Sequence, residues 1–127
     1  MKLKDIAELL EIKVWTEELY DPEKDINFAF SCDLMSDALM LLRRLNKDTV
    51  LEECVLITGL ITNQSIRTAE MLDIEVILYV RDKRPSDALI KLAKESNILL
   101  LSTKYLMYTT NGVLFSKGIL GATNAIH

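Results

Sequence analysis

The sequence has few of the residues from which small catalytic and metal sites are built. His127 is the only histidine, and Cys32 and Cys54 are the only cysteines. One histidine at the end of the chain excludes Ser-His-Asp triads and most zinc sites. Two cysteines without CxxC spacing favour reduced thiols in a cytoplasmic protein, with a disulfide between them as the lesser alternative. We therefore expect no metal, no cofactor and no enzymatic activity.

Glycine, proline and clustered positive charge are also scarce. The 127 residues include 4 Gly and 2 Pro, and 15 Lys and Arg stand against 19 Asp and Glu, for a net charge of -4. Long flexible linkers are therefore not expected, and an acidic chain without a basic stripe disfavours nucleic-acid binding. The P-loop, GxGxxG and GxSxG motifs are absent as well, which argues against a self-contained kinase, dehydrogenase or hydrolase.

Long hydrophobic runs are missing too. The longest, such as Val76–Val80 and Ile98–Leu101, have the length of strands, whereas a membrane helix needs about 20 apolar residues. Lys2 and Lys4 interrupt the N-terminal segment, so it does not resemble a signal peptide. Half of the residues are hydrophobic, which suits one core. We expect a soluble, cytoplasmic protein with a single domain over residues 1–127 and no contact with membranes.

The sequence does contain a regularly repeated pattern of strand and helix. Residues 26–32 alternate between apolar and small or polar side chains, as in a strand. Three later runs are continuously apolar, as in strands buried on both faces: Cys54–Ile57, Val76–Val80 and Ile98–Leu101. Since a helical pattern follows each strand, we expect parallel βαβ units. The predicted fold class is α/β, with three layers and a mostly parallel sheet of about four to five strands flanked by helices.

The two ends of the chain differ from this repeat. Apolar residues at helical spacing predict a short N-terminal helix over residues 2–11, and Val14 and Trp15 a short edge strand. Residues 120–127 are expected to form a loose tail.

The last helix is predicted to run past a glycine. It begins at Ser102 or Thr103 and reaches about Gly118, although Asn111 and Gly112 offer an earlier end. We favour continuation because an interior glycine costs only about 1 kcal/mol relative to alanine.

A ligand site is predicted where the strands end. In open parallel sheets ligands collect beyond the carboxyl ends of the strands, and here four loops lead from those ends into helix N-termini, which favour anions. Arg81, Lys83 and Arg84 add positive charge to one of these loops. The residues predicted to bind the ligand are Asp33, Asp37, Thr58, Gly59, Asn63, Gln64, Arg67, Arg81, Lys83, Ser102 and Thr103.

Several of these residues also have a purely structural interpretation. Asp33 and Asn63 are ordinary helix caps, and so is Ser86, which with Pro85 is expected to open a helix that reaches about Ser96. Gly59 suits a turn, and Arg81–Arg84 could be a solvated charged loop. Asp33 and Asp37 are four residues apart, so they could share one helix face as a carboxylate pair for a divalent metal.

Cysteines and aromatic residues receive similar double interpretations. Cys54 lies in an apolar run and is expected in the core, whereas Cys32, near a helix N-terminus, could be a reactive thiol. Four large side chains of the last helical segment are expected to pack rather than to stack on a ligand: Tyr105, Met107, Tyr108 and Phe115.

Three stretches together resemble a known family. They are Ser31–Asp37 (SCDLMSD), Leu56–Leu60 (LITGL) with Gln64–Leu72, and Tyr79–Pro85 (YVRDKRP) followed by Ile98–Thr103. On these residues the chain resembles a stand-alone DRTGG-domain protein, related to the N-terminal domain of HPr kinase/phosphorylase. The similarity covers nearly the whole chain after the first helix. It departs from the family at Asp25–Phe30 (DINFAF), where an Asp-Arg-x-Thr-Gly-Gly-like stretch would stand.

The resemblance implies a compact regulatory α/β domain. Such domains accompany phosphotransacetylases and CBS-domain pyrophosphatases and often take part in dimer contacts, and stand-alone members are often encoded near hydrogenase-like and signalling proteins. The positions that match the family pattern are Asp33, Asp37, Thr58, Gly59, Arg67, Arg81, Lys83 and Pro85.

The leading hypothesis is a non-enzymatic regulatory or sensor module. It would bind a small anionic, nucleotide-like ligand. It would act as a homodimer or on a protein partner, and that partner would be a signalling protein or a hydrogenase-related protein. One alternative is a structural dimerisation or accessory subunit without a ligand. A second is a small metal-dependent enzyme that uses Asp33 and Asp37.

Overall fold

Six strands form one mixed sheet in the computed structural model, which describes residues 1–42, 45 and 47–123. The strands are β1 (Lys13–Val14), β2 (Phe28–Ser31), β3 (Cys54–Thr58), β4 (Val76–Tyr79), β5 (Leu99–Ser102) and β6 (Leu120–Gly121). Their order across the sheet is β1-β5-β4-β3-β2-β6, and only β1 runs antiparallel to its neighbour. The four longer strands are those predicted. The sheet has six strands rather than the expected four to five, because a strand of two residues lies at each edge.

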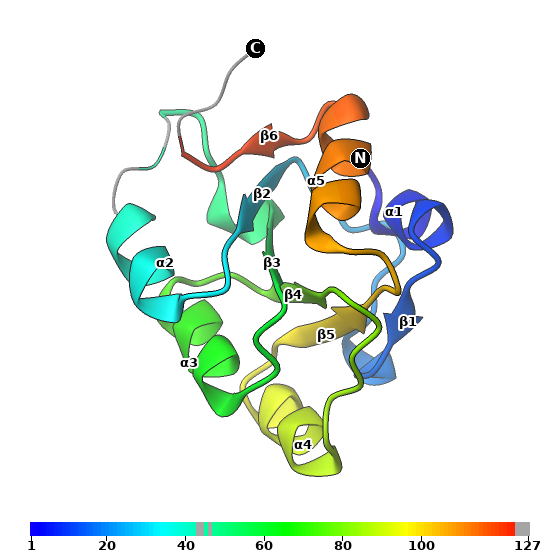
Figure 1. The fold of residues 1–127 in the computed structure, drawn as a ribbon, viewed down its shortest axis with the longest axis vertical. Coiled ribbons are helices and arrows are strands. Elements are labelled where there is room, and N and C mark those ends of the chain that lie inside the picture. Colours follow the sequence, from blue (N-terminus) through cyan, green and yellow to red (C-terminus); the bar gives the residue numbers. More distant parts are fainter. Residues whose placement is uncertain (43–44, 46, 124–127) are drawn as a thin grey trace.

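Helices cover both faces of this sheet (Figure 1). They are α1 (Leu3–Leu9), α2 (Met35–Leu41), α3 (Asn63–Met71), α4 (Asp87–Glu95) and α5 (Met107–Ser116), with 3-10 turns at Glu17–Leu19 and Leu51–Glu53. Residues of α2, α3 and α4 share one apolar cluster, and residues of α1 and α5 share the other. The predicted three-layer α/β fold is therefore confirmed.

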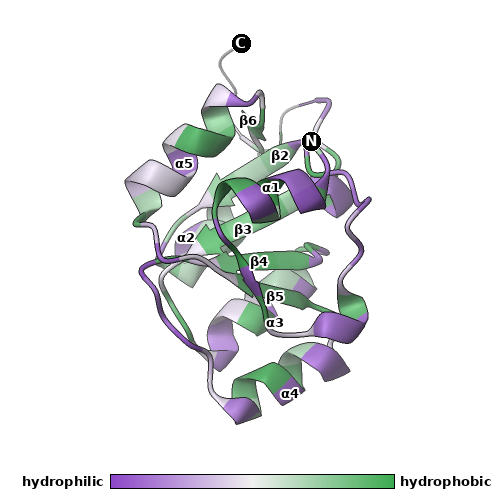
Figure 2. Ribbon diagram, turned by 90° about the vertical axis from the view of Figure 1, so that its right-hand side faces the viewer, coloured by the Kyte–Doolittle hydropathy of each residue, from purple (hydrophilic) through white to green (hydrophobic). Residues whose placement is uncertain are grey.

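The central strands form these two clusters by alternating their side chains. All five residues of β3 are buried, and Leu56 belongs to the cluster below α2–α4 whereas Ile57 belongs to the cluster below α1 and α5. Ile77 and Leu78 of β4 divide in the same way. Successive strand residues point to opposite faces, so a continuous apolar run is the pattern of a strand covered on both sides. Figure 2 shows β3 and β4 as hydrophobic, whereas α1 and α4 carry both hydrophilic and hydrophobic stretches.

Helix caps follow the sequence in one case and depart from it in two. Ser86 caps α4 as expected, because its hydroxyl accepts a hydrogen bond from the backbone nitrogen of Leu89 at 3.1 Å. Asp33 and Asn63 do not cap: the N-cap residues of α2 and α3 are Leu34 and Thr62, and neither makes a side-chain cap bond. The cap interpretation of Asp33 and Asn63 is therefore wrong.

The ends of the chain are more ordered than the sequence predicted. The N-terminal helix covers Leu3–Leu9 rather than 2–11. Leu120–Gly121 pairs with β2. The expectation of a loose tail over residues 120–127 is therefore wrong for residues 120 and 121. Residues 124–127 lie outside the described residues.

The last helix does continue through Gly112, as predicted, but begins later. It starts at Met107 instead of Ser102 or Thr103. Thr103 is held outside the helix because its backbone N–H donates to the carbonyl oxygen of Tyr79 and its carbonyl oxygen accepts from Asp82 N–H. Its buried hydroxyl also donates to the carbonyl oxygen of Leu10 at 2.7 Å.

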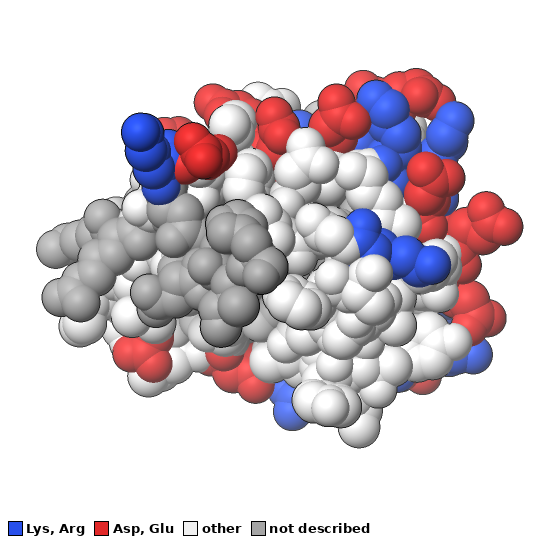
Figure 3. All heavy atoms as spheres, turned by 90° about the horizontal axis from the view of Figure 1, so that it is seen from above, with Lys and Arg blue, Asp and Glu red and all other residues white. Residues whose placement is uncertain are grey.

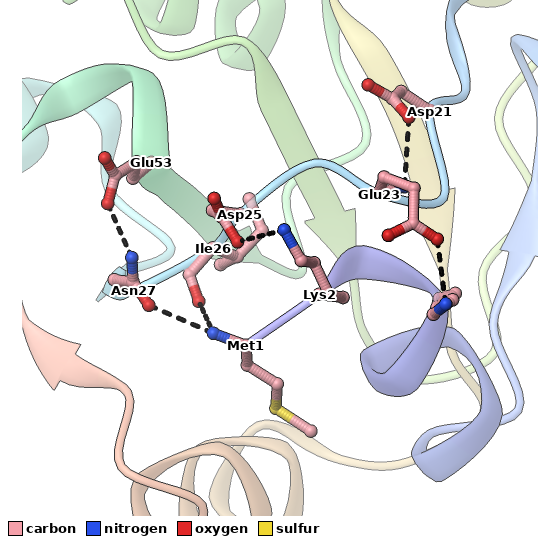
Figure 4. A network of polar contacts seen from close by, with 9 residues as sticks. Met1, Lys2, Asp21, Glu23, Asp25, Ile26, Asn27 and Glu53 are labelled. Carbon is pink, nitrogen blue, oxygen red and sulfur yellow. Dashed lines mark hydrogen bonds and ion pairs between the residues drawn. The ribbon is translucent and has the colours of Figure 1, made fainter.

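The segment before β2 is held to the start of the chain by polar contacts (Figure 4). The amino group of Met1 donates to the carbonyl oxygen of Ile26 at 3.1 Å and to Oδ1 of Asn27 at 3.0 Å. Lys2 and Asp25 form an ion pair at 2.9 Å. Among the described residues, no helix is long and apolar enough to cross a membrane.

Candidate functional site

The loops after β2 and β3 meet at the carboxyl edge of the sheet. The backbone nitrogen of Gly59 donates a hydrogen bond to Oδ1 of Asp33 at 2.7 Å, and the hydroxyl of Thr58 donates to the same oxygen at 3.4 Å. The Thr58 hydroxyl also accepts from the backbone nitrogen of Leu60 at 3.1 Å. The parallel register, which pairs Ser31 with Ile57, brings these loops together. Asp33 therefore orders the start of the loop that follows β3.

Two cations from the loop after β4 reach the same glycine residue. Nη2 of Arg81 lies 3.1 Å from the carbonyl oxygen of Gly59, and Nζ of Lys83 lies 3.3 Å from it. Within the described part of the chain, neither cation forms an ion pair with a carboxylate. Gly59 is thus bound on its N–H side by an acid and on its carbonyl side by two cations.

The loop that carries the cations has an unusual backbone. Arg81 and Asp82 have φ values of +73° and +56°, a left-handed conformation that costs non-glycine residues about 1–3 kcal/mol each. Two backbone hydrogen bonds hold it: Arg81 N–H donates to Tyr105 and Asp82 N–H to Thr103, both at 3.0 Å. This conformation directs the Arg81 side chain across Gly59, where a β-carbon would collide with the guanidinium group. The glycine therefore permits a close approach rather than a flexible turn.

Other residues predicted for the site are engaged elsewhere. Arg67 pairs with Glu70 on its own helix at 3.3 Å, and the Ser102 hydroxyl accepts from Trp15 Nε1 at 2.9 Å. Thr103, as described above, bonds to Leu10. Three more predicted residues are exposed and, among the described residues, have no hydrogen bond to the cluster: Asp37, Asn63 and Gln64. The cluster that the structure assembles consists of Asp33, Thr58, Gly59, Arg81 and Lys83, and its role as a ligand site stays a prediction.

The two cysteines are free thiols in the structure, so the disulfide alternative is wrong. Cys54 is buried in the core, as expected, and burial raises its pKa to about 12. Cys32 is half-buried and donates to the carbonyl oxygen of Leu34 at 3.2 Å. Burial is the largest cause of its raised pKa. A helix N-terminus was expected to lower that pKa, so Cys32 lacks the activation that a reactive thiol needs.

The structure contains a second concave region that the sequence interpretation missed. A groove of about 460 Å³ lies between α5 and the strands β2 and β6. Ser31, Asn111 and Gly112 line it together with Tyr108 and Phe115. The last two side chains are 89% and 60% exposed, so the expectation that they pack in the core is wrong. The available signal was the sequence of α5, which has no charged residue over its ten positions.

Comparison with protein-family models gives no match, and comparison with curated proteins gives none either. Among solved structures, the chain is similar to the CBS and DRTGG domains of the regulatory region of Clostridium perfringens pyrophosphatase, complexed with the activator diadenosine tetraphosphate. The TM-score is 0.60 at 17% sequence identity, over 89% of this chain and 45% of the other. The chain thus spans less than half of that regulatory region, and at this identity the likeness establishes a shared fold. The α/β fold of this chain is therefore shared with part of that structure.

Proposed function

We propose that the chain is a non-enzymatic regulatory module of the DRTGG type that binds a small anionic, nucleotide-like ligand at the carboxyl edge of its sheet. The observation that carries this proposal is the convergence of Arg81 and Lys83 on the Gly59 carbonyl. Cationic groups held beside a backbone dipole, with no acidic partner among the described residues, are suited to a phosphate. The shared fold with a regulatory region that was solved with a nucleotide activator supports the same class of function.

Binding would exchange one set of contacts for another. A carbonyl oxygen carries only a partial negative charge, whereas a phosphate offers full charge and several acceptor oxygens. Arg81 and Lys83 would therefore turn from Gly59 towards the ligand, because a phosphate adds the attraction of an opposite charge and, for arginine, a bidentate contact. Asp33 would keep the Gly59 N–H in place, and the loop after β3 would report occupancy to a partner surface.

The decisive experiment measures ligand-dependent thermal stabilisation. Diadenosine tetraphosphate, ATP and pyrophosphate are added separately to the wild-type chain and to the double variant Arg81→Ala, Lys83→Ala. A ligand at a hundredfold excess over its Kd should stabilise the wild type by about 2.7 kcal/mol, and the double variant should lose most of this response. Lys91→Ala is the matched control, because Lys91 is an exposed cation on α4 outside the cluster.

The outcomes separate the site from non-specific charge effects. An equal loss of response in Lys91→Ala would assign the effect to general electrostatics. An unchanged response in the double variant, or no response to any of the three probes in the wild type, would overturn the proposed site.

One observation favours the alternative of a structural dimerisation subunit. Met40 and Met71, near the ends of the neighbouring helices α2 and α3, are 65% and 70% exposed. Exposed apolar side chains on adjacent helices are typical of a protein interface. Sedimentation of the wild type and of Met71→Glu tests this alternative: it requires a wild-type dimer that dissociates in the variant. A wild-type monomer at all concentrations would contradict it.

A further inference from the structure

The groove beside α5 lies between that helix and the strands β2 and β6. The floor comes from β2 and β6, where Ala29, Ser31 and Gly121 contribute small side chains or none. One wall is α5 itself, from Tyr108 to Phe115. A volume of about 460 Å³ lies within the range of small-molecule sites, which are mostly apolar and contain a few polar groups.

Gly112 has no structural reason to be glycine within the described protein. It lies in the interior of α5, where glycine is less favourable than alanine. A β-carbon at this position would meet no atom within 4 Å, and its φ is not in the left-handed region. The missing side chain instead exposes helix backbone at the groove. Gly112 therefore leaves room for close approach by a group from outside the chain.

Two aromatic side chains flank that exposed backbone. Tyr108, Gly112 and Phe115 have the spacing i, i+4 and i+7, which places them on one face of the helix. Seven residues correspond to about 10 Å along a helix axis. Both aromatic side chains are largely exposed and both line the groove. The arrangement leaves room for a planar ring system over Gly112 with an aromatic side chain at each end.

A polar pair supplies directional contacts in this apolar setting. The hydroxyl of Ser31 donates to Oδ1 of Asn111 at 2.6 Å. That oxygen has a second lone pair, and among the described residues the Asn111 side-chain nitrogen donates to no acceptor. The amide therefore presents an acceptor and a donor side by side, the arrangement with which asparagine binds the N6/N7 edge of adenine.

Charge is absent from this part of the surface. None of the 14 residues that line the groove is Lys, Arg, Asp or Glu, although the chain carries 34 such residues (15 basic and 19 acidic). Figure 3, which views the molecule from above, shows a white area without acidic side chains that a basic side chain interrupts. A site without charge matches an uncharged ligand, because no ionic group would be desolvated without a partner.

We propose that this groove is a binding site for an uncharged planar heteroaromatic ring of the purine class, presented as a nucleoside. The ring stacks between Tyr108 and Phe115 above Gly112, and its donor–acceptor edge pairs with Asn111. This site is separate from the cation cluster, and its existence does not depend on the proposed function.

Adenosine is the probe, because it has the purine edge and no phosphate. Titration followed by amide chemical shifts should perturb residues of α5, β2 and β6. Inosine replaces the amino donor by a carbonyl, so it should bind at least about fivefold more weakly, the lower end of the discrimination by a bidentate amide. Asn111→Leu should remove this preference for adenosine.

Gly112→Leu fills the groove without touching the core. Because its β-carbon meets nothing, this variant should fold with unchanged or higher thermal stability and lose adenosine binding. Thr109→Leu is the matched control: it introduces the same side chain at an exposed position of α5 outside the groove, and binding should persist. The double variant Arg81→Ala, Lys83→Ala should bind adenosine as the wild type does.

Three results would overturn the proposal. They are no shift perturbation at millimolar adenosine, equal affinity for adenosine and inosine, and undiminished binding by Gly112→Leu. Concentration-dependent shifts in the same α5 residues without ligand, together with a dimer in sedimentation, would assign the groove to a second copy of the chain instead.

Discussion

The carboxylate of Asp33 lies 2.7 Å from the backbone nitrogen of Gly59, and it joins the loops that follow two neighbouring strands. The same glycine accepts hydrogen bonds from Arg81 and Lys83 through its carbonyl oxygen. The loops that follow β2, β3 and β4 are thus joined through one residue, Gly59. This arrangement makes the acid structural and leaves the cations available for a ligand.

Replacing Asp33 by alanine should lower the free energy of unfolding by about 1 kcal/mol, because the N–H group of Gly59 loses its acceptor in a part-buried hydrogen bond. Asp33→Asn retains an acceptor oxygen and should cost less. Urea unfolding measures both. Asp37→Ala is the control, an exposed acid without a described partner on the same segment, and it should change stability by less than about 0.5 kcal/mol. Equal losses in the Asp33 and Asp37 variants would contradict the bridging role.

Gly59→Ala should displace the Arg81 side chain, because a β-carbon would collide with the guanidinium group. The direction of the effect is a loss of stability, by about 1 kcal/mol rather than the larger cost of an overpacked core, because the guanidinium group is the end of a flexible side chain that can move aside. Arg81→Ala removes the obstacle. In a double-mutant cycle, Gly59→Ala should therefore cost at least about 0.5 kcal/mol less in the Arg81→Ala background than in the wild type. Additive changes would mean that the two residues do not meet in solution.

The sequence predicts those parts of the fold that depend on local pattern. The runs Cys54–Ile57 and Val76–Val80 contain enough apolar residues to identify buried strands, and Ser86 identifies the start of α4. The strand β6 is two residues long and exists because Leu120 reaches the edge of β2. Such a short strand has no periodicity of its own, so only the three-dimensional position of its partner could have revealed it.

The candidate site illustrates the same limit. The carboxyl-end rule correctly brings Asp33, Gly59 and Arg81 to one edge of the sheet. It does not tell which neighbour each side chain prefers. The Asp33 carboxylate could accept a hydrogen bond from a helix backbone nitrogen close in sequence or from the Gly59 nitrogen, which is 26 residues away. The register of β2 against β3 places the Gly59 nitrogen beside it. Arg67 likewise forms an ion pair with Glu70, one helical turn away. This ion pair would compete with any ligand for the guanidinium group of Arg67.

Ser65 and Tyr79 should respond unequally to removal of their shared hydrogen bond. Their oxygen atoms lie 2.7 Å apart in the buried layer between α3 and β4, and Ser65 also donates to the carbonyl oxygen of Thr62 at 2.7 Å. Tyr79→Phe leaves Ser65 with a partner and should cost about 1 kcal/mol. Ser65→Ala leaves a buried phenol without one and should cost about 1–3 kcal/mol. Urea unfolding tests the order, and a larger loss in Tyr79→Phe would contradict it.

Stability should decline at alkaline pH because of two buried acids. Burial raises the pKa of Cys54 from 9.0 to about 12 and that of Tyr79 from 10.0 to about 12. Between pH 9 and 12 the unfolded chain releases these protons while the folded chain keeps them, so the folded state binds more protons and the free energy of unfolding falls as pH rises. Each group contributes up to about 1.4 kcal/mol per pH unit within its window.

The measurement is urea unfolding at intervals from pH 8 to 11. Tyr79→Phe should show a shallower decline above pH 10, and Cys54→Val a shallower decline from pH 9. The control Tyr108→Phe alters a phenol that is 89% exposed and should follow the wild type. A decline of the same slope in all four proteins would refute the assignment to the buried groups.

Thiol labelling should distinguish the two cysteines by accessibility. Cys32 is half-buried beside Leu34, so a disulfide reagent at pH 8 should modify it in the folded protein, more slowly than a free thiol because its pKa is raised. Cys54 lies at the start of β3 with no exposed surface. It should react only when the sheet opens, and its labelling rate in Cys32→Ser should rise with urea in proportion to the unfolded population. Rapid labelling of Cys54 without denaturant would mean that β2 and β3 separate locally where Phe28 pairs with Cys54, at the opposite end of the strand pair from the hydrogen bond between Asp33 and Gly59.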